Sequence, residues 1–184
     1  MKIINDIYNA MNEGFAVYKS AAAALEKRRR ELSGNEYSDE YRASELQTIA
    51  IRRDFDILQL DKRVRAAIDN FKIAARKKTA FNAGDILPTT IALFGGNVPL
   101  TRDDYVFAFD TATNNSTRRY ICACAESKGV VDFGRKVYTA DEYAAAADAI
   151  YTFFRSAMQR PQWEKQWISD LDVVAPECLK GADL

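Results

Sequence analysis

Thiol, carboxylate and ammonium side chains gather between residues 104 and 128, where they are the groups of this sequence best suited to chemistry. Cys122 and Cys124 have the alternate spacing that places two thiols on one face of a strand, as in half of a zinc site. Two further ligands are needed, and Cys178 is far along the chain. We therefore favour reduced cysteines packed in a core opposite Phe107, and we expect no metal or other cofactor.

A second set of groups suggests a magnesium-dependent nuclease. Asp104 and Asp110 lie on one predicted strand, and Glu126 and Lys128 follow the next. Carboxylates that hold magnesium, together with a lysine that steadies the attacking water, resemble the core of restriction endonucleases. The residue between Glu and Lys is usually apolar in that family, whereas Ser127 stands here. The nuclease is the enzyme-class alternative, and we expect the chain not to be an enzyme.

The composition excludes several kinds of active site. The sequence contains no histidine, which removes Ser-His-Asp and Cys-His catalysis, His-ligated zinc and an imidazole base at neutral pH. The 26 basic and 26 acidic residues cancel. Residues 1–80 carry sixteen basic and twelve acidic residues, and residues 81–184 carry ten and fourteen. This modest asymmetry argues against a protein that coats DNA.

The elements that would position these groups begin with a long helical hairpin. Apolar residues recur every three or four positions over about 3–32 and again over 39–78, which predicts one apolar seam along each of two helices. Ser33 and Gly34 are suited to end the first helix, and Ser38 is suited to cap the second. We predict an antiparallel, coiled-coil-like hairpin over residues 1–80.

A connector over 81–100, rich in Gly and Pro, leads to a small α+β domain over 101–184. The alternation of Tyr105, Phe107 and Phe109 predicts a strand, a second one carries Tyr120, Cys122 and Cys124 on one face, and 130–138 supplies a third. Asn114 and Asn115 suit the first turn. The predicted fold class is therefore α+β, with a long N-terminal antiparallel helical hairpin followed by a small antiparallel β-sheet packed with one or two helices.

The C-terminal part of that domain is predicted to be helical. Thr139 and Glu142 form a capping box, and Tyr138 and Tyr143 have the spacing of a hydrophobic staple. Pro161 begins a second, shorter helix on which aromatic residues share a face with Leu171.

The end of the hairpin is the predicted partner-binding surface. It combines a basic run with tyrosines, and Arg and Tyr are favoured at interface hot spots. The residues concerned are Lys27, Arg28, Arg29, Arg30, Tyr37 and Tyr41. We expect a protein partner there, and a nucleic acid is the alternative.

A second apolar stripe lies on the longer helix of the hairpin. It consists of Ile51, Phe55 and Leu58, which the first helix cannot cover. The stripe predicts either homo-oligomerisation or burial beneath the C-terminal domain.

The opening segments, Met1-Lys-Ile-Ile-Asn-Asp-Ile-Tyr8 and Tyr18-Lys-Ser-Ala-Ala-Ala-Ala-Leu25, resemble small accessory proteins of phages and mobile elements of Gram-positive bacteria. Some of those are anti-CRISPR proteins that bind Cas9. The resemblance implies a non-enzymatic protein that binds and inhibits a nuclease effector such as Cas9 or its guide-RNA complex. A phage structural or scaffolding protein is the alternative.

The expected location is the cytoplasm of the bacterial host cell. No apolar run approaches the roughly 20 residues of a membrane span, and the N-terminal segment is amphipathic and lacks the apolar core of a signal peptide. We therefore expect no membrane association.

Overall fold

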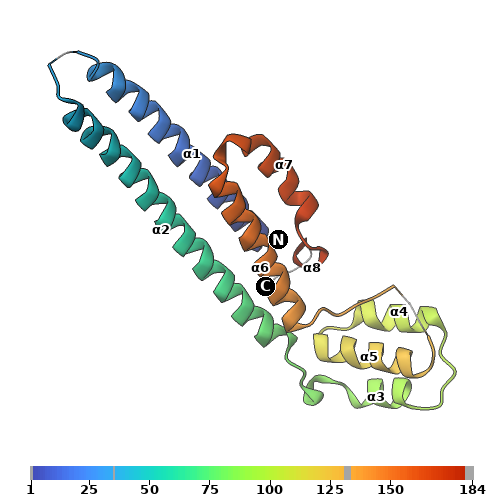
Figure 1. Cartoon of the computed structure of the whole chain (residues 1–184). Helices are drawn as coiled ribbons and strands as arrows, with labels where there is room; N and C mark the ends of the chain where they lie inside the picture. Colours follow the sequence, from blue (N-terminus) through green and yellow to red (C-terminus); the bar gives the residue numbers. More distant parts are fainter. Residues whose placement is uncertain (1, 35, 131–133, 181–184) are drawn as a thin grey trace. The chain divides into compact units, whose positions relative to one another are not determined.

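The computed structural model describes residues 2–34, 36–130 and 134–180, and the chain is 82% helical (Figure 1). These residues form two compact units, one comprising residues 1–72 and 145–184 and the other residues 73–144. The predicted domain boundaries at residues 80 and 100 differ from the boundaries of these two units. The prediction assigned the C-terminal helices to a domain separate from the hairpin. Within the described ranges, no helix has the length and hydrophobicity needed to cross a bilayer.

The first unit is built on the predicted hairpin, and its two helices are confirmed. Helix α1 spans Lys2–Glu31 and α2 spans Asp39–Thr79, of which residues 39–72 belong to this unit. The Ser38 hydroxyl accepts a hydrogen bond from the Tyr41 amide at 3.2 Å, as expected of a cap. Arg28 lies beside Glu45, and Arg63 lies beside Glu13. The two helices therefore run antiparallel, as predicted.

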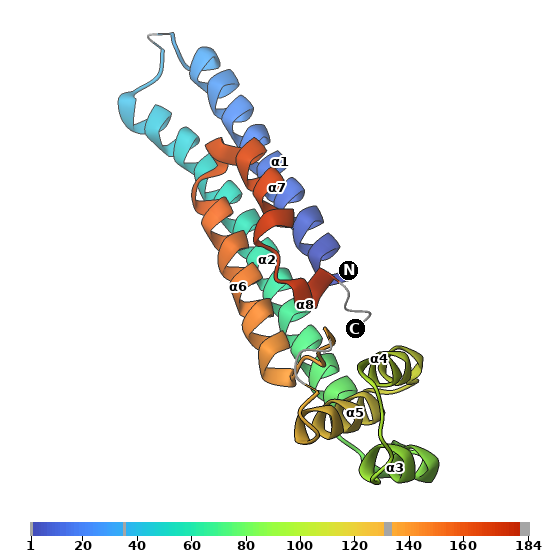
Figure 2. The ribbon, with the colours of Figure 1, turned by 90° about the vertical axis from the view of Figure 1, so that its right-hand side faces the viewer.

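Three C-terminal helices cover the base of the hairpin. Helix α6 spans Ala140–Gln159, a 3-10 turn spans Pro161–Trp163, α7 spans Glu164–Val174 and α8 spans Glu177–Lys180. In this unit α6 runs along α2, and α7 returns along α1 (Figure 2). The Tyr151 hydroxyl donates to Asp61, and Lys19 pairs with Glu164.

The core of this unit joins all four long helices through buried apolar side chains. They include Ile7, Met11, Phe15, Leu60, Val64, Ile68, Ile150, Phe154, Ala157 and Leu171. Burial of large apolar side chains contributes about 1.5–3 kcal/mol each, which explains why the four helices pack together at this end of the hairpin.

The second unit consists of short helices. A 3-10 turn spans Ala83–Asp85, α3 spans Pro88–Gly95, α4 spans Arg102–Thr111 and α5 spans Asn115–Ser127. Their shared core is Phe94, Tyr105, Phe109, Ile121 and Ala125. The first residues of α6 belong to this unit. There the predicted capping box is confirmed, since the Thr139 amide donates to Glu142 and the Glu142 amide donates to Thr139.

The predicted α+β fold class is wrong, because the described residues contain helices and no strand. Tyr105 and Phe109 are buried whereas Phe107 is 70% exposed, so the repeat along this segment is four and not two. Thr101 and Asp104 form a capping box that starts α4, and Asn114 caps α5 instead of forming a hairpin turn. The third predicted strand lies partly outside the described residues, and its described part is irregular.

Candidate interaction surface

The outer half of the hairpin lacks the covering helices of its base. Helix α6 ends at Gln159, and the Met158 carbonyl there accepts a hydrogen bond from the Tyr18 hydroxyl at 2.7 Å. Beyond this level, none of residues 16–31 of α1 and none of residues 39–59 of α2 is buried. Lys19 still pairs with Glu164 of α7, and residues 54–58 of α2 still border α6. The remaining faces of α1 and α2 in this half are exposed or half-buried and are available to a partner.

A groove of about 650 Å³ runs between α1 and α2 on one side of this outer half. Small and aliphatic side chains line it together with charged ones. The residues that line it are Glu13, Ala16, Val17, Ser20, Ala21, Ala24, Thr48, Ile49, Arg52, Arg53 and Asp56. The guanidinium of Arg53, which lines the groove, lies over the Tyr18 ring, 5.8 Å from its centroid, and so links the two helices.

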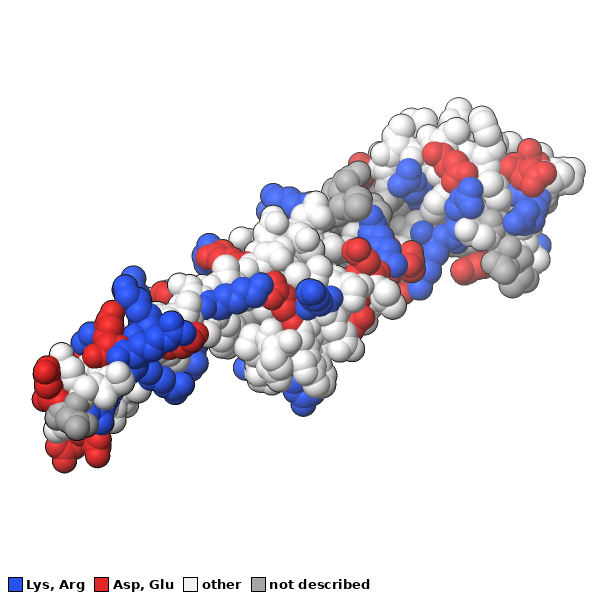
Figure 3. Space-filling model, turned by 90° about the horizontal axis from the view of Figure 1, so that it is seen from above, with Lys and Arg blue, Asp and Glu red and all other residues white. Residues whose placement is uncertain are grey.

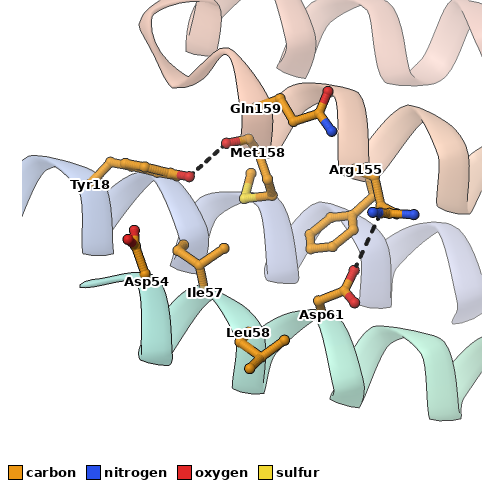
Figure 4. Close-up of a pocket in the computed structure, with 9 residues that line it drawn as sticks. Tyr18, Asp54, Ile57, Leu58, Asp61, Arg155, Met158 and Gln159 are labelled. Carbon is orange, nitrogen blue, oxygen red and sulfur yellow. Dashed lines mark hydrogen bonds and ion pairs between the residues drawn. The ribbon is translucent and has the colours of Figure 1, made fainter. Parts of the chain in front are cut away.

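A smaller cleft of about 320 Å³ lies where α6 ends against the hairpin (Figure 4). Ile57, Leu58 and Met158 supply its apolar surface, and Asp54 and Asp61 lie at its polar edge. Arg155 lies 4.0 Å from the Asp61 carboxylate. Burial raises the pKa of the Tyr18 hydroxyl above its usual value, and this hydroxyl donates to the Met158 carbonyl beside the cleft. The cleft offers an apolar pocket with charged edges that suits one side chain of a partner.

The predicted basic tip is largely neutralised by the acidic residues around it. Arg28 is half-buried and pairs with Glu31 and Glu45, Lys27 pairs with Glu31, and Arg30 pairs with Glu26. Residues 26–45 contain five basic and six acidic residues. Acidic and basic side chains are accordingly interspersed at this end of the hairpin (Figure 3). The tip is therefore a mixed-charge surface and lacks the basic excess typical of a nucleic-acid site.

The two tyrosines of the predicted site lie together at the start of α2. Tyr37 and Tyr41 are 39% and 44% exposed, and their rings stack at 5.5 Å between centroids. Arg29 is exposed on α1. The tyrosine pair is the most apolar part of the tip and remains a candidate contact for a partner.

Three of the four residues of the nuclease alternative have separate structural roles. Asp104 accepts hydrogen bonds from Thr101, which lower its pKa, and Asp110 pairs with Arg135, which lowers its pKa as well. The Lys128 ammonium donates to the Gly96 carbonyl at 2.5 Å. Within the described residues, no three potential ligands among His, Cys, Asp and Glu lie close enough to share a metal ion. The geometry therefore does not bring the four groups into one site.

The two neighbouring cysteines do not share one face of a strand, as was predicted, because they lie on a helix. Cys122 and Cys124 lie two residues apart on α5, so their side chains point about 200° apart around the helix axis. Both are half-buried against the core of the second unit. Burial raises the pKa of the Cys122 thiol, which makes it a poor nucleophile at neutral pH.

The groove of the hairpin was not predicted from sequence, although a signal was present. The run Ala21-Ala-Ala-Ala24, with Ala16 and Ser20 before it, gives α1 a side without large residues. Small residues allow another helix to approach closely, but only the antiparallel partner α2 turns them into a groove.

Comparison of the chain with protein-family models, curated proteins and solved structures finds no match.

Proposed function

We propose that this chain is a non-enzymatic binding protein whose helical hairpin receives a helix of a partner protein. One observation carries this proposal. A groove of about 650 Å³ lies between α1 and α2, and no residue of 16–31 in α1 or of 39–59 in α2 is buried. Helices gain most of their stability in proteins by burying an apolar face. A hairpin that extends without such cover is therefore suited to bind another molecule, whose side chains would supply the missing contacts.

The dimensions and chemistry of the groove favour a helix over an extended peptide. From Glu13 to Ala24 it spans eleven residue steps of α1, which is roughly 16 Å and therefore about three turns of an added helix. Ala16, Ala21 and Ala24 are among its lining residues, and their small side chains let the axis of an added helix come close. The described outer half has helices only, so it presents no sheet edge for an added strand.

The specific form of this function is inhibition of a nuclease effector such as Cas9, as the resemblance of the N-terminal segments implies. The alternative, a phage structural or scaffolding protein, would use the same groove for assembly. The nuclease inhibitor and the structural protein would bind different partners, and both would bind them through the groove.

The test is a binding assay with a matched pair of substitutions in neighbouring alanines. Ala24 is exposed and lines the groove, whereas Ala23 is exposed and lies outside it. Ala24→Arg places a long charged side chain in the groove, and Ala23→Arg makes the same change beside it. Purified wild type and both variants are mixed with Cas9, with and without guide RNA, and complexes are measured by gel filtration and calorimetry.

We expect wild type and Ala23→Arg to bind equally, and Ala24→Arg to lose at least about tenfold in affinity, or about 1.4 kcal/mol. Equal binding by all three proteins would contradict the role of the groove. No binding to Cas9 by wild type would contradict the nuclease-inhibitor form. Circular dichroism of the free proteins checks that each variant keeps its helix content.

A further inference from the structure

We infer that the outward face of α2 is the contact between two copies of this chain, packed antiparallel about a twofold axis midway between Ile51 and Phe55. The face is defined by Ile51, Phe55 and Leu58, which are 60%, 58% and 49% exposed. Their spacing of four and three places them on one side of the helix. The three residues of this stripe do not line the groove, whose α2 residues are Thr48, Ile49, Arg52, Arg53 and Asp56.

The stripe points away from α1. Ile51 lies nine residues before the buried Leu60, which corresponds to about half a turn around the helix axis. Leu60 faces the core of the first unit, so Ile51 faces outward. Only Leu58 reaches the edge of the cleft at the end of α6. The described residues of this unit therefore leave the stripe in contact with solvent.

The same face of α2 changes its chemistry along the helix. After Leu58 it continues through Lys62, Arg65 and Asp69, all exposed, as is usual for a solvated helix face. Between Glu40 and Asp69, the large apolar residues of this face are thus confined to the segment 51–58. A local apolar stripe within an otherwise polar face is typical of an interaction surface.

The charges on this face favour a second copy and determine its direction. Exposed Glu40 lies before the stripe, and exposed Lys62 and Arg65 lie after it. If two copies pack antiparallel with Ile51 of one against Phe55 of the other, Leu58 lies opposite Thr48, and Arg65 comes beside Glu40. A twofold axis forms each of these contacts twice. Parallel packing would instead place Lys62 and Arg65 against the same residues of the other copy and would be disfavoured.

The expected contact is moderate in strength. The segment from 40 to 65 spans roughly 39 Å of helix, and its apolar part is only the middle. Such a helix pair falls at the low end of the size of specific interfaces, about 1,200 Å² in total. We therefore expect reversible dimers with a dissociation constant in the micromolar range.

The experiment is sedimentation equilibrium of the full chain from about 1 µM to 1 mM, a range that brackets micromolar affinity. Wild type should change from monomer to dimer, and Phe55→Glu should stay monomeric throughout. Val173→Glu is the matched control, because Val173 is 80% exposed on α7 and lies outside the stripe. This variant should dimerise like wild type. A wild type that is monomeric at every concentration, or a dimer that Phe55→Glu leaves intact, would overturn the proposal.

A charge exchange tests the direction of packing. Glu40→Lys and Arg65→Glu should each weaken the dimer, whereas the double variant should regain the affinity of wild type. Failure of the double variant to recover would contradict the antiparallel register. If Phe55→Glu loses helix content, Ile51→Asp replaces it, since Ile51 is equally exposed and its substitution leaves the core intact.

Discussion

Gly14 of α1 lies directly against Met158 of α6. A Cβ atom built on Gly14 would be closer than 3.0 Å to the Met158 sulfur and 3.2 Å from Leu60 Cδ2. This is the level at which α1, α2 and α6 come together, and one turn further along α1 the Tyr18 hydroxyl binds the Met158 carbonyl. A glycine in a helix interior costs about 1 kcal/mol relative to alanine, so its presence here is explained by the close approach of α6.

Gly14→Val should therefore destabilise the first unit although it removes a glycine from a helix. The branched side chain must displace Met158 and Leu60, and overpacking of this kind costs about 1–3 kcal/mol. Urea denaturation followed by circular dichroism measures the change. Met158→Ala in the Gly14→Val background should restore part of the lost stability by making room. The control is Ala16→Val, which changes an exposed residue of the same helix and should have little effect on stability. An equal loss of stability in Ala16→Val would mean that the helix propensity of valine, and not its packing, destabilises the Gly14→Val variant.

Arg28 should hold the outer half of the hairpin together. It is the residue of the basic run that bridges the helices, with hydrogen bonds of 2.7 and 3.2 Å from Arg28 to the Glu45 carboxylate and one of 2.9 Å to Glu31. Arg28→Gln should increase amide hydrogen exchange in residues 25–45 and leave exchange at the base unchanged. Arg29→Gln is the control, because Arg29 is exposed and none of the described ion pairs involves it. Unchanged exchange in Arg28→Gln would show that the hairpin end does not depend on this bridge.

The second unit should lose stability in acid through its paired carboxylates. Hydrogen bonds and the charge of Arg135 lower the pKa of Asp110 below its ordinary value of 3.8, and Lys136 together with Thr139 lowers the pKa of Glu142 below 4.5. A lowered pKa in the folded state means that the contribution is complete above the ordinary value. It is then lost as the pH falls through the lower, folded-state value.

This prediction is measured by carboxyl NMR titration and by thermal unfolding between about pH 2 and 7, the range in which carboxylates titrate. Arg135→Gln should return the pKa of Asp110 toward 3.8 and reduce the acid dependence of unfolding. Arg102→Gln, which removes a charge beside Asp103, should leave the Asp110 titration unchanged. An Asp110 pKa that does not respond to Arg135→Gln would contradict the ion pair.

The long helices and several of their end signals were predictable from the sequence alone. The periodicity of apolar residues indicated α1 and α2, and Ser38 and Thr139 marked helix starts that the structure confirms. These signals are local, because a cap or an amphipathic repeat depends on residues within a few positions of one another. The same kind of signal was present at Thr101 and Asp104 but was outweighed by the apparent alternation of aromatic residues.

The tertiary structure decided what local patterns leave open. Tyr105, Phe107 and Phe109 fit a strand as well as a helix, and only packing on Phe94 and Ile121 shows that Phe107 is the exposed one. The charge of the basic run is also partly neutralised in the folded chain, because folding brings Glu45 beside Arg28. The groove follows from which residues of α1 and α2 face each other where α6 no longer covers them. These are contacts between distant residues, and composition and spacing along one segment do not specify them.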